Sequence, residues 1–460
     1  MRKRNVLSAA IVLLTGISAA SAQVDALDTG RAIEIPTERP ALERVIREAL
    51  LHNPGLRAEA ERLTAAEQAI AQARAQGLPT ISIQGSVETS DGAYDPGAAG
   101  GALIGSLFPP TTDGEPSPLE GFGSTDTRQV QLSVTQPLFT GFKIKNGIEE
   151  ARASVDVARA GFEATKQGYA LRVAEAYLAV VTAQARQVAL DTSLTAVAEE
   201  SRAAQISFET GQNTKTDLAL VNARRAAIDA QAAGAVAQLQ SARANFVALA
   251  GVEPPQLDLT DAELIVPINV ERAISTAMQN NAELRAAVSM VAARGAAARA
   301  TKGQRAPNIQ LRGTLSYGEN NFLPGDQSSN ATIAAELDMP FYQGGAVGAS
   351  VRAASAEARA SRFALTDAQL QLEAQVRGAF AEYQAAVIAQ EAAKAQLNAA
   401  DLAFQGVTLE REVGQRSVLD VLRVEEDLQS ARLNEISARR NVILASYRLR
   451  ALMGTLLRDE

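Results

Sequence analysis

The chain has 460 residues, of which 47% are hydrophobic and 4% aromatic, and its formal charge is −8 at pH 7. It has no cysteine and one histidine, His52, which excludes disulfides and thiolate chemistry and disfavours histidine-based metal or triad sites. The acidic balance without a dense basic run disfavours nucleic-acid binding, and we expect no cofactor.

The first 22 residues have the pattern of a secretory signal peptide. Arg2-Lys3-Arg4 is a positively charged start, residues 6–20 are apolar, and Ala20-Ser21-Ala22 supplies small residues for cleavage. The apolar run is short for a membrane span, and no later run approaches about 20 apolar residues. We therefore expect removal of residues 1–22, an exported mature chain that begins near Gln23, and no transmembrane helix.

The remaining chain consists of two similar copies of one plan. Motifs of the first half recur in the same order in the second half. The matched pairs are Pro79 with Pro307, 137–141 with 340–344, Gly211 with Gly414, and Asp217 with Asp420. We divide the chain into a first repeat (23–252), a linker (253–270), a second repeat (271–455) and a tail (456–460).

Each repeat is predicted to contain two strands, because apolar and polar residues alternate over runs of about 10 residues. In the first repeat the strands flank a long polar loop at 90–126, and in the second repeat they occupy 307–317 and 331–341. An ordinary sheet over a soluble core would also alternate in this way. The polar loops and the aromatic residues near the strand ends favour strands of an outer-membrane barrel, which have this length when tilted.

Four strands cannot close a barrel, and open sheet edges are not tolerated in lipid. Several chains must therefore share one barrel. Three chains would give 12 strands, while two or four chains remain possible from the residues alone.

Long helices are predicted after each strand pair. Residues 143–208 and 346–412 contain no proline and keep an alanine- and charge-rich helical pattern, which corresponds to about 100 Å of helix. The chain reverses near 211 and near 414, and the returning helices, 216–249 and 418–452, are about half as long. We expect the shorter helices before the strands, 55–76 and 283–303, to stack end to end on the returning helices.

The duplication, the strand-to-helix exits with Pro137 and Gly141 or Pro340 and Gly344, and the two reversals together resemble the TolC-like outer-membrane efflux and secretion family. The resemblance implies an α+β membrane protein in the outer membrane of a Gram-negative bacterium. It implies a homotrimer with a shared 12-stranded β-barrel in outer-membrane lipid, a periplasmic coiled-coil helical barrel, and an equatorial belt that includes the linker. Residues 208–217 resemble those of members that serve type I protein secretion.

The resemblance also assigns the functional residues. The helix tips that contact a periplasmic adaptor protein would be Thr210, Gly211, Gln212, Val413, Gly414 and Gln415. The periplasmic gate would contain Asp217, Arg416, Asp420 and Arg423, with Arg416 paired to Asp217 between neighbouring hairpins. Two positions depart from the family: Arg423 stands where a second acidic ring is usual, and Arg411 stands where a tyrosine is common. Without the resemblance, these residues would be helix caps and solvated charges.

These features predict a passive channel that works with an adaptor and an inner-membrane ABC or proton-driven transporter to export proteins or small toxic compounds. The alternative is a structural periplasmic coiled-coil scaffold with a β cap, which would have no need of membrane-type strands. We expect no enzyme activity. The carboxylate pairs Glu149-Glu150, Glu199-Glu200 and Glu425-Glu426 fall in helices and are interpreted as solvated faces.

Overall fold

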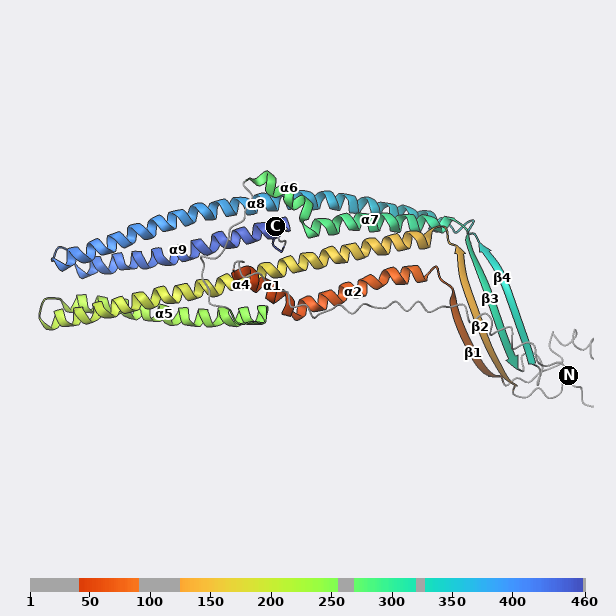
Figure 1. Cartoon of the computed structure of the whole chain (residues 1–460), viewed down its shortest axis with the longest axis horizontal. Coiled ribbons are helices and arrows are strands. Elements are labelled where there is room, and N and C mark those ends of the chain that lie inside the picture. The colour runs from red at the N-terminus through yellow and green to blue at the C-terminus, as the bar shows by residue number, and fades with distance from the viewer. Residues whose placement is uncertain (1–40, 91–124, 255–268, 320–326, 458–460) are drawn as a thin grey trace, which may run out of the picture. The chain divides into compact units, whose positions relative to one another are not determined.

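The computed structural model describes residues 41–90, 125–254, 269–319 and 327–457. The expected signal peptide, nearly all of the 90–126 loop and most of the linker lie outside the described residues. The described part contains two successive sets of helices and strands that follow the same order (Figure 1).

The helices and strands of the first set are α1 (Ala41–His52), α2 (Pro54–Ala75), β1 (Thr80–Ser90), β2 (Thr125–Phe139), α4 (Lys143–Glu209) and α5 (Lys215–Ala250). Those of the second set are α6 (Val270–Asn280), α7 (Ala282–Lys302), the 3₁₀ turn η2 (Gly303–Arg305), β3 (Asn308–Glu319), β4 (Gln327–Asp338), α8 (Ala346–Glu412) and α9 (Val418–Met453).

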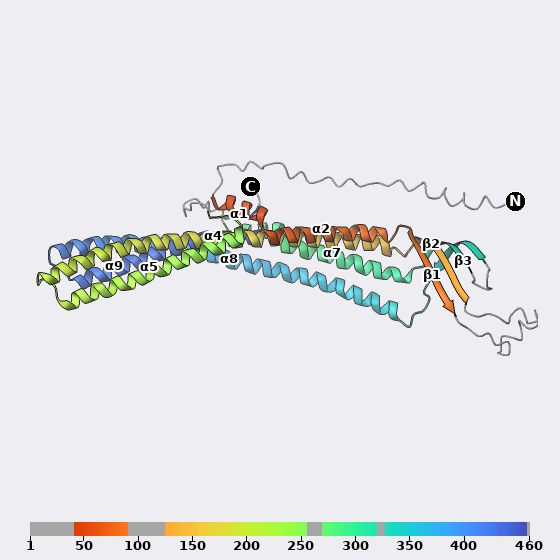
Figure 2. The same ribbon diagram turned by 90° about the horizontal axis from the view of Figure 1, so that it is seen from below.

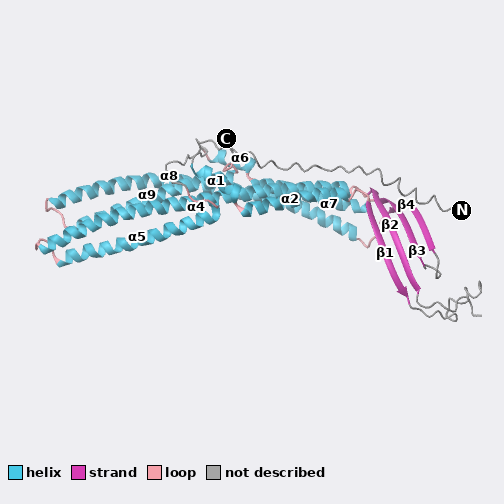
Figure 3. Cartoon of the chain, turned by 60° about the horizontal axis from the view of Figure 1, so that its bottom comes forward, coloured by secondary structure: helices cyan, strands magenta, loops and turns pink. Residues whose placement is uncertain are grey.

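The four strands form one antiparallel sheet in the order β1-β2-β3-β4, coloured magenta in Figure 3. Its register gathers the apolar residues on one face, in rows such as Ile83–Leu132–Leu315. The other face carries hydroxyl and amide side chains, and the Ser82 and Ser133 hydroxyl oxygens lie 2.7 Å apart there. In a single chain the apolar face is uncovered: Ile83 is 73% and Ile333 is 82% exposed.

Prolines set the ends of the second-repeat strands. The expected strand at 307–317 begins at Asn308, after Pro307, and the expected strand at 331–341 is Gln327–Asp338. The prediction of strand through Pro340 was wrong because proline has no N–H for the ladder and restricts the residue before it. In β2, Pro137 is accommodated by a register shift between Pro137 and Phe139.

The long helices α4 and α8 have 67 residues each and run unbroken. Each packs along its returning helix, so α4 pairs with α5 and α8 pairs with α9. The two hairpins lie side by side, and α9 contacts both α4 and α5 (Figure 2). No helix in the described ranges is long and apolar enough to cross a membrane.

Two asparagines join the short helices to the returning helices at the expected end-to-end junctions. The Asn53 side chain accepts a hydrogen bond from the Leu56 N–H at the start of α2 and donates to the Leu249 carbonyl at the end of α5. Asn281 does the same in the second set, accepting from the Leu284 N–H and donating to the Leu452 carbonyl at 2.9 Å. In each set, one asparagine side chain thus caps the start of one helix and donates a hydrogen bond to a carbonyl in the last turn of another.

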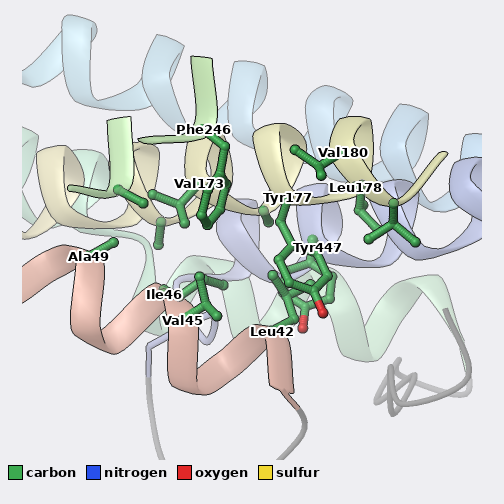
Figure 4. Packing of buried hydrophobic residues seen from close by; sticks show 14 of the residues in the cluster. Leu42, Val45, Ile46, Ala49, Val173, Tyr177, Leu178, Val180, Phe246 and Tyr447 are labelled. Carbon is green, nitrogen blue, oxygen red and sulfur yellow. The ribbon is translucent and has the colours of Figure 1, made fainter. Parts of the chain in front are cut away.

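The largest hydrophobic core lies where α1, α4, α5 and α9 meet (Figure 4). Small aliphatic residues dominate it, and a few aromatic rings fill the remaining space, with Tyr177 against Phe246 at 6.3 Å between ring centroids. Burial raises the pKa of the Tyr447 hydroxyl well above its usual range. This core holds both hairpins together midway along the long helices.

Candidate functional site: the two helix reversals

The two reversals have the same backbone geometry. Gly211 has φ +75° and Gly414 has φ +78°, a left-handed conformation that glycine adopts without a Cβ penalty. The Gln212 N–H donates to the Ser207 carbonyl at 2.7 Å, and the Gln415 N–H donates to the Glu410 carbonyl at 2.8 Å. This six-residue closure is the Schellman motif, which ends a helix at a glycine.

A capping box starts each returning helix. The Thr214 backbone N–H donates to the Asp217 carboxylate at 3.1 Å, and the Asp217 N–H donates back to the Thr214 hydroxyl at 3.2 Å. Ser417 and Asp420 repeat this arrangement at 3.1 and 3.2 Å. Hydrogen bonds from the Thr214 and Ser417 side chains hold the pKa of Asp217 and of Asp420 below the usual aspartate value. Both predicted gate carboxylates are therefore ionised caps within their own hairpins.

In the single chain, Arg416 pairs with a residue of its own hairpin, and the expected link to Asp217 between neighbouring hairpins stays a prediction. Its Nε donates to the Glu410 carboxylate at 2.7 Å, and this bond raises the pKa of the guanidinium. Glu410 lies on the same hairpin, just before the reversal, so the tight turn itself brings the two charges together. Arg423 is exposed one turn after Asp420, and its charge lowers the pKa of Asp420 slightly further.

A bridge between the hairpins involves Arg411, the position that departs from the family pattern. Arg411 Nη1 lies 2.5 Å from a Glu200 carboxylate oxygen, which joins α8 to α4. Both side chains are about three-quarters buried, at 24% and 20% exposed. The sequence marks Arg411 as unusual but does not indicate its partner, which is distant along the chain. The interpretation of Glu200 as a solvated carboxylate was wrong, because its side chain is largely buried against Arg411.

A second bridge joins α5 to α9 and was missed by sequence reasoning. The Arg224 guanidinium donates to Glu425 Oε2 at 3.1 and 3.0 Å and to Gln429 at 2.8 Å, and Gln429 donates on to Gln231 at 2.8 Å. The side chains of Arg224 and Glu425 are only 13% and 9% exposed. The interpretation of Glu425 as part of a solvated face was wrong; burial raises its pKa, and the facing Arg224 only partly counteracts that rise.

The strand-to-helix exits place glycine for different reasons in the two copies. Gly141 has φ +62°, and a Cβ there would lie 2.4 Å from the Gly303 carbonyl oxygen. Gly344 has φ +59° with nothing within 4 Å of that position. At the first exit the turn between β2 and α4 therefore makes a close backbone contact with η2, whereas the second exit needs glycine only for its dihedral angle. Within the described ranges, no group of His, Cys, Asp and Glu side chains could hold a metal ion.

Comparison with known proteins assigns this architecture to a family. The family model described as "Outer membrane efflux protein" matches residues 45–252 and 273–455. The outer membrane efflux protein BepC of Brucella suis is 28% identical over 379 residues, covering 81% of this chain and 80% of that protein. The proteases secretion protein PrtF of Dickeya chrysanthemi is 27% identical over 313 residues, which cover 64% of this chain and 66% of PrtF.

Solved structures agree on the fold. The open-state MtrE outer membrane channel of Neisseria gonorrhoeae superposes with a TM-score of 0.74 at 20% identity, covering 91% of this chain and 90% of that chain. Long helical hairpins joined to four antiparallel strands are thus the protomer of an outer-membrane channel, and the chain is a transport protein rather than an enzyme. It belongs to the TolC-like outer membrane efflux protein family of Gram-negative bacteria.

Proposed function

We propose that three copies of this chain form one export channel, with a 12-stranded barrel in outer-membrane lipid and a helical barrel in the periplasm. The observation that carries the proposal is the four-stranded sheet, whose outer strands β1 and β4 each pair on one side only. Its apolar face is exposed in a single chain, and unpaired strand edges are not stable in lipid. Pairing of β4 with β1 of the next copy satisfies both edges.

The division into repeats at 23–252 and 271–455, joined by the linker, is part of this proposal. It is supported by the two separate segments that match the family, 45–252 and 273–455. It is also supported by the paired asparagine joints at Asn53 and Asn281, which perform the same task in each set of helices.

We assign the periplasmic entrance to the two reversals, with Thr210, Gly211, Gln212, Val413, Gly414 and Gln415 as contacts for an adaptor protein. Exposed tips with the same backbone geometry on both hairpins support this role. Asp217, Arg416, Asp420 and Arg423 would line the gate. The Arg416–Asp217 link would form between chains when Asp217 of a neighbouring copy displaces Glu410 from Arg416, and an adaptor would have to outcompete it. The energy would come from an inner-membrane ABC or proton-driven transporter.

Chemical crosslinking tests the adaptor contact, because the chain has no cysteine of its own. A single Gln415→Cys variant carrying a thiol-linked photo-crosslinker should capture a periplasmic adaptor in cells, and Arg243→Cys, exposed on α5 away from the tip, should not. Equal capture from both positions, or none from Gln415→Cys, would remove the tip assignment.

The exported substrate is proposed to be protein in a type I secretion system. Support comes from the resemblance of residues 208–217 and from the similarity to a relative named for protease secretion. In a host that lacks its own TolC-like channel, the chain should restore secretion of a type I substrate when the matching adaptor and transporter are present. Restored resistance to small toxic compounds without any secretion would assign it to efflux instead.

A further inference from the structure

The helix ends nearest the sheet carry an excess of positive charge that the rest of the chain does not share. Arg74 lies in the last turn of α2, Lys143 and Lys145 lie at the start of α4, and Lys302 and Arg305 lie at the α7–η2 end. We call these five residues the junction collar. The whole chain has a formal charge of −8, so this local excess runs against the overall balance.

Helix stability does not explain the collar. Lys143 and Lys145 lie in the first turn of α4, which contains no acidic residue. The N-terminus of a helix has a partial positive charge, so two lysines there are unfavourable for the helix. The stability of α4 therefore does not account for the position of these two lysines.

The collar charges have no counter-ion in the described residues. All five side chains belong to exposed residues, and none has a carboxylate oxygen within 4.0 Å among the described ranges. Their neighbour Arg299 differs, because its Nη2 lies 2.8 Å from the Glu149 carboxylate. Glu149 is thus already paired with Arg299 rather than with a collar cation.

Exposed apolar side chains lie in the same strand-to-helix segments. Leu78 is 60%, Phe142 is 62%, Phe341 is 97% and Tyr342 is 83% exposed. Aromatic rings beside cations are the combination that a bilayer surface favours, with rings at the interface and cations at the lipid phosphates. Phe142 even keeps a left-handed backbone at φ +61° and packs edge-on against Phe139 at 5.4 Å.

We infer that the junction collar binds the anionic phospholipid headgroups of the membrane leaflet that faces the helices. The inference rests on the proposed function, in which the sheet lies in the outer membrane with the helices on its periplasmic side. Each lysine or arginine near an anionic surface changes affinity by about fivefold. The collar would thereby fix the depth of the barrel and select acidic lipid around it.

Lipid-quenching fluorescence provides the test. The chain contains no tryptophan, so Phe341→Trp gives a single reporter at a side chain that is 97% exposed. In mixed bilayers, brominated phosphatidylglycerol should quench this reporter several-fold more effectively than brominated phosphatidylcholine. The preference should decrease in 1 M salt, where charges are screened within about 3 Å.

A matched pair of variants separates the collar from general surface charge. Lys143→Gln/Lys302→Gln/Arg305→Gln in the reporter background should lose most of the phosphatidylglycerol preference. The control Arg202→Gln/Arg225→Gln/Arg243→Gln removes three exposed cations of α4 and α5 and should keep it. Equal quenching by both lipids, or equal loss in both variants, would overturn the inference. So would a collar variant that keeps lipid selectivity but dissociates into single chains, since the collar would then bind a neighbouring copy.

Discussion

The buried bridge between α5 and α9 predicts a large effect from a single substitution. Arg224→Met removes the only cation that lies within 4.0 Å of the Glu425 carboxylate among the described residues, and it also removes the bond to Gln429. Breaking a buried ion pair by deleting one partner costs about 3–5 kcal/mol, because the remaining charge is left without compensation. Glu425 can limit this cost by taking up a proton, so we expect about 3 kcal/mol at neutral pH.

Hydrogen exchange of backbone amides measures this loss of stability locally, at the bridge between α5 and α9. A loss of about 3 kcal/mol corresponds to roughly a hundredfold faster exchange of the α5 and α9 amides around the bridge. Arg225→Met, at the exposed neighbouring position, should leave exchange unchanged. Arg224→Met/Glu425→Leu should recover most of the protection, because replacing both members of a buried pair by apolar groups is often neutral. A double variant as unprotected as Arg224→Met would refute the reasoning.

The same bridge predicts a pH dependence whose sign follows from Glu425. Its pKa is raised in the folded chain, so the folded state binds more protons than the unfolded state between the ordinary glutamate value and the raised one. The free energy of unfolding therefore decreases as pH rises through that window, because the folded state gives up a proton that it binds more tightly than the unfolded state does, and it is constant above the window. Glu425→Gln should abolish this slope.

Two further substitutions test the joints and the exits. Asn281→Ala should destabilise the chain by about 2–3 kcal/mol in thermal or denaturant unfolding, because it removes a helix cap and the hydrogen bond to the half-buried Leu452 carbonyl. Asn269→Ala removes only an exposed cap and should cost about 1 kcal/mol. Equal losses would show that the second bond has no effect. Gly141→Ala should prevent folding or shift the backbone, since its Cβ would meet the Gly303 carbonyl at 2.4 Å, whereas Gly344→Ala should fold with a loss of about 1 kcal/mol. Comparable expression and unfolding of both variants would contradict the close contact.

The sequence predicts the elements well because their signals are local. The alternation of apolar and polar residues predicts the strands, and the absence of proline over 143–208 and 346–412 allows the two long helices, without any knowledge of distant contacts. The stacking of short helices on returning helices follows because the returning helices fall short of the long helices by about the length of the short ones. Asn53 and Asn281 supply the contacts at these junctions.

The site could be predicted only in part, because its charges find partners through the fold. Glu200 and Glu425 have the pattern of solvated helix faces, and only packing of the hairpins buries them against Arg411 and Arg224. Arg416 forms an ion pair with Glu410 across the reversal, and comparison with the family's motif does not predict this pair. The junction collar escapes detection for a similar reason, since its cations come from separate segments and form no dense run along the chain.

Single-channel conductance in a planar bilayer tests the central claim most directly, that this chain forms a gated export channel with its entrance at the reversals. The purified wild-type oligomer should give a small conductance that favours cations. Arg416→Ser should increase the conductance, and Asp420→Ala should reduce the cation preference, because three symmetry-related carboxylates would then be absent from the entrance. A stable oligomer that conducts nothing would contradict the channel, and a conductance indifferent to both substitutions would contradict the position of its gate.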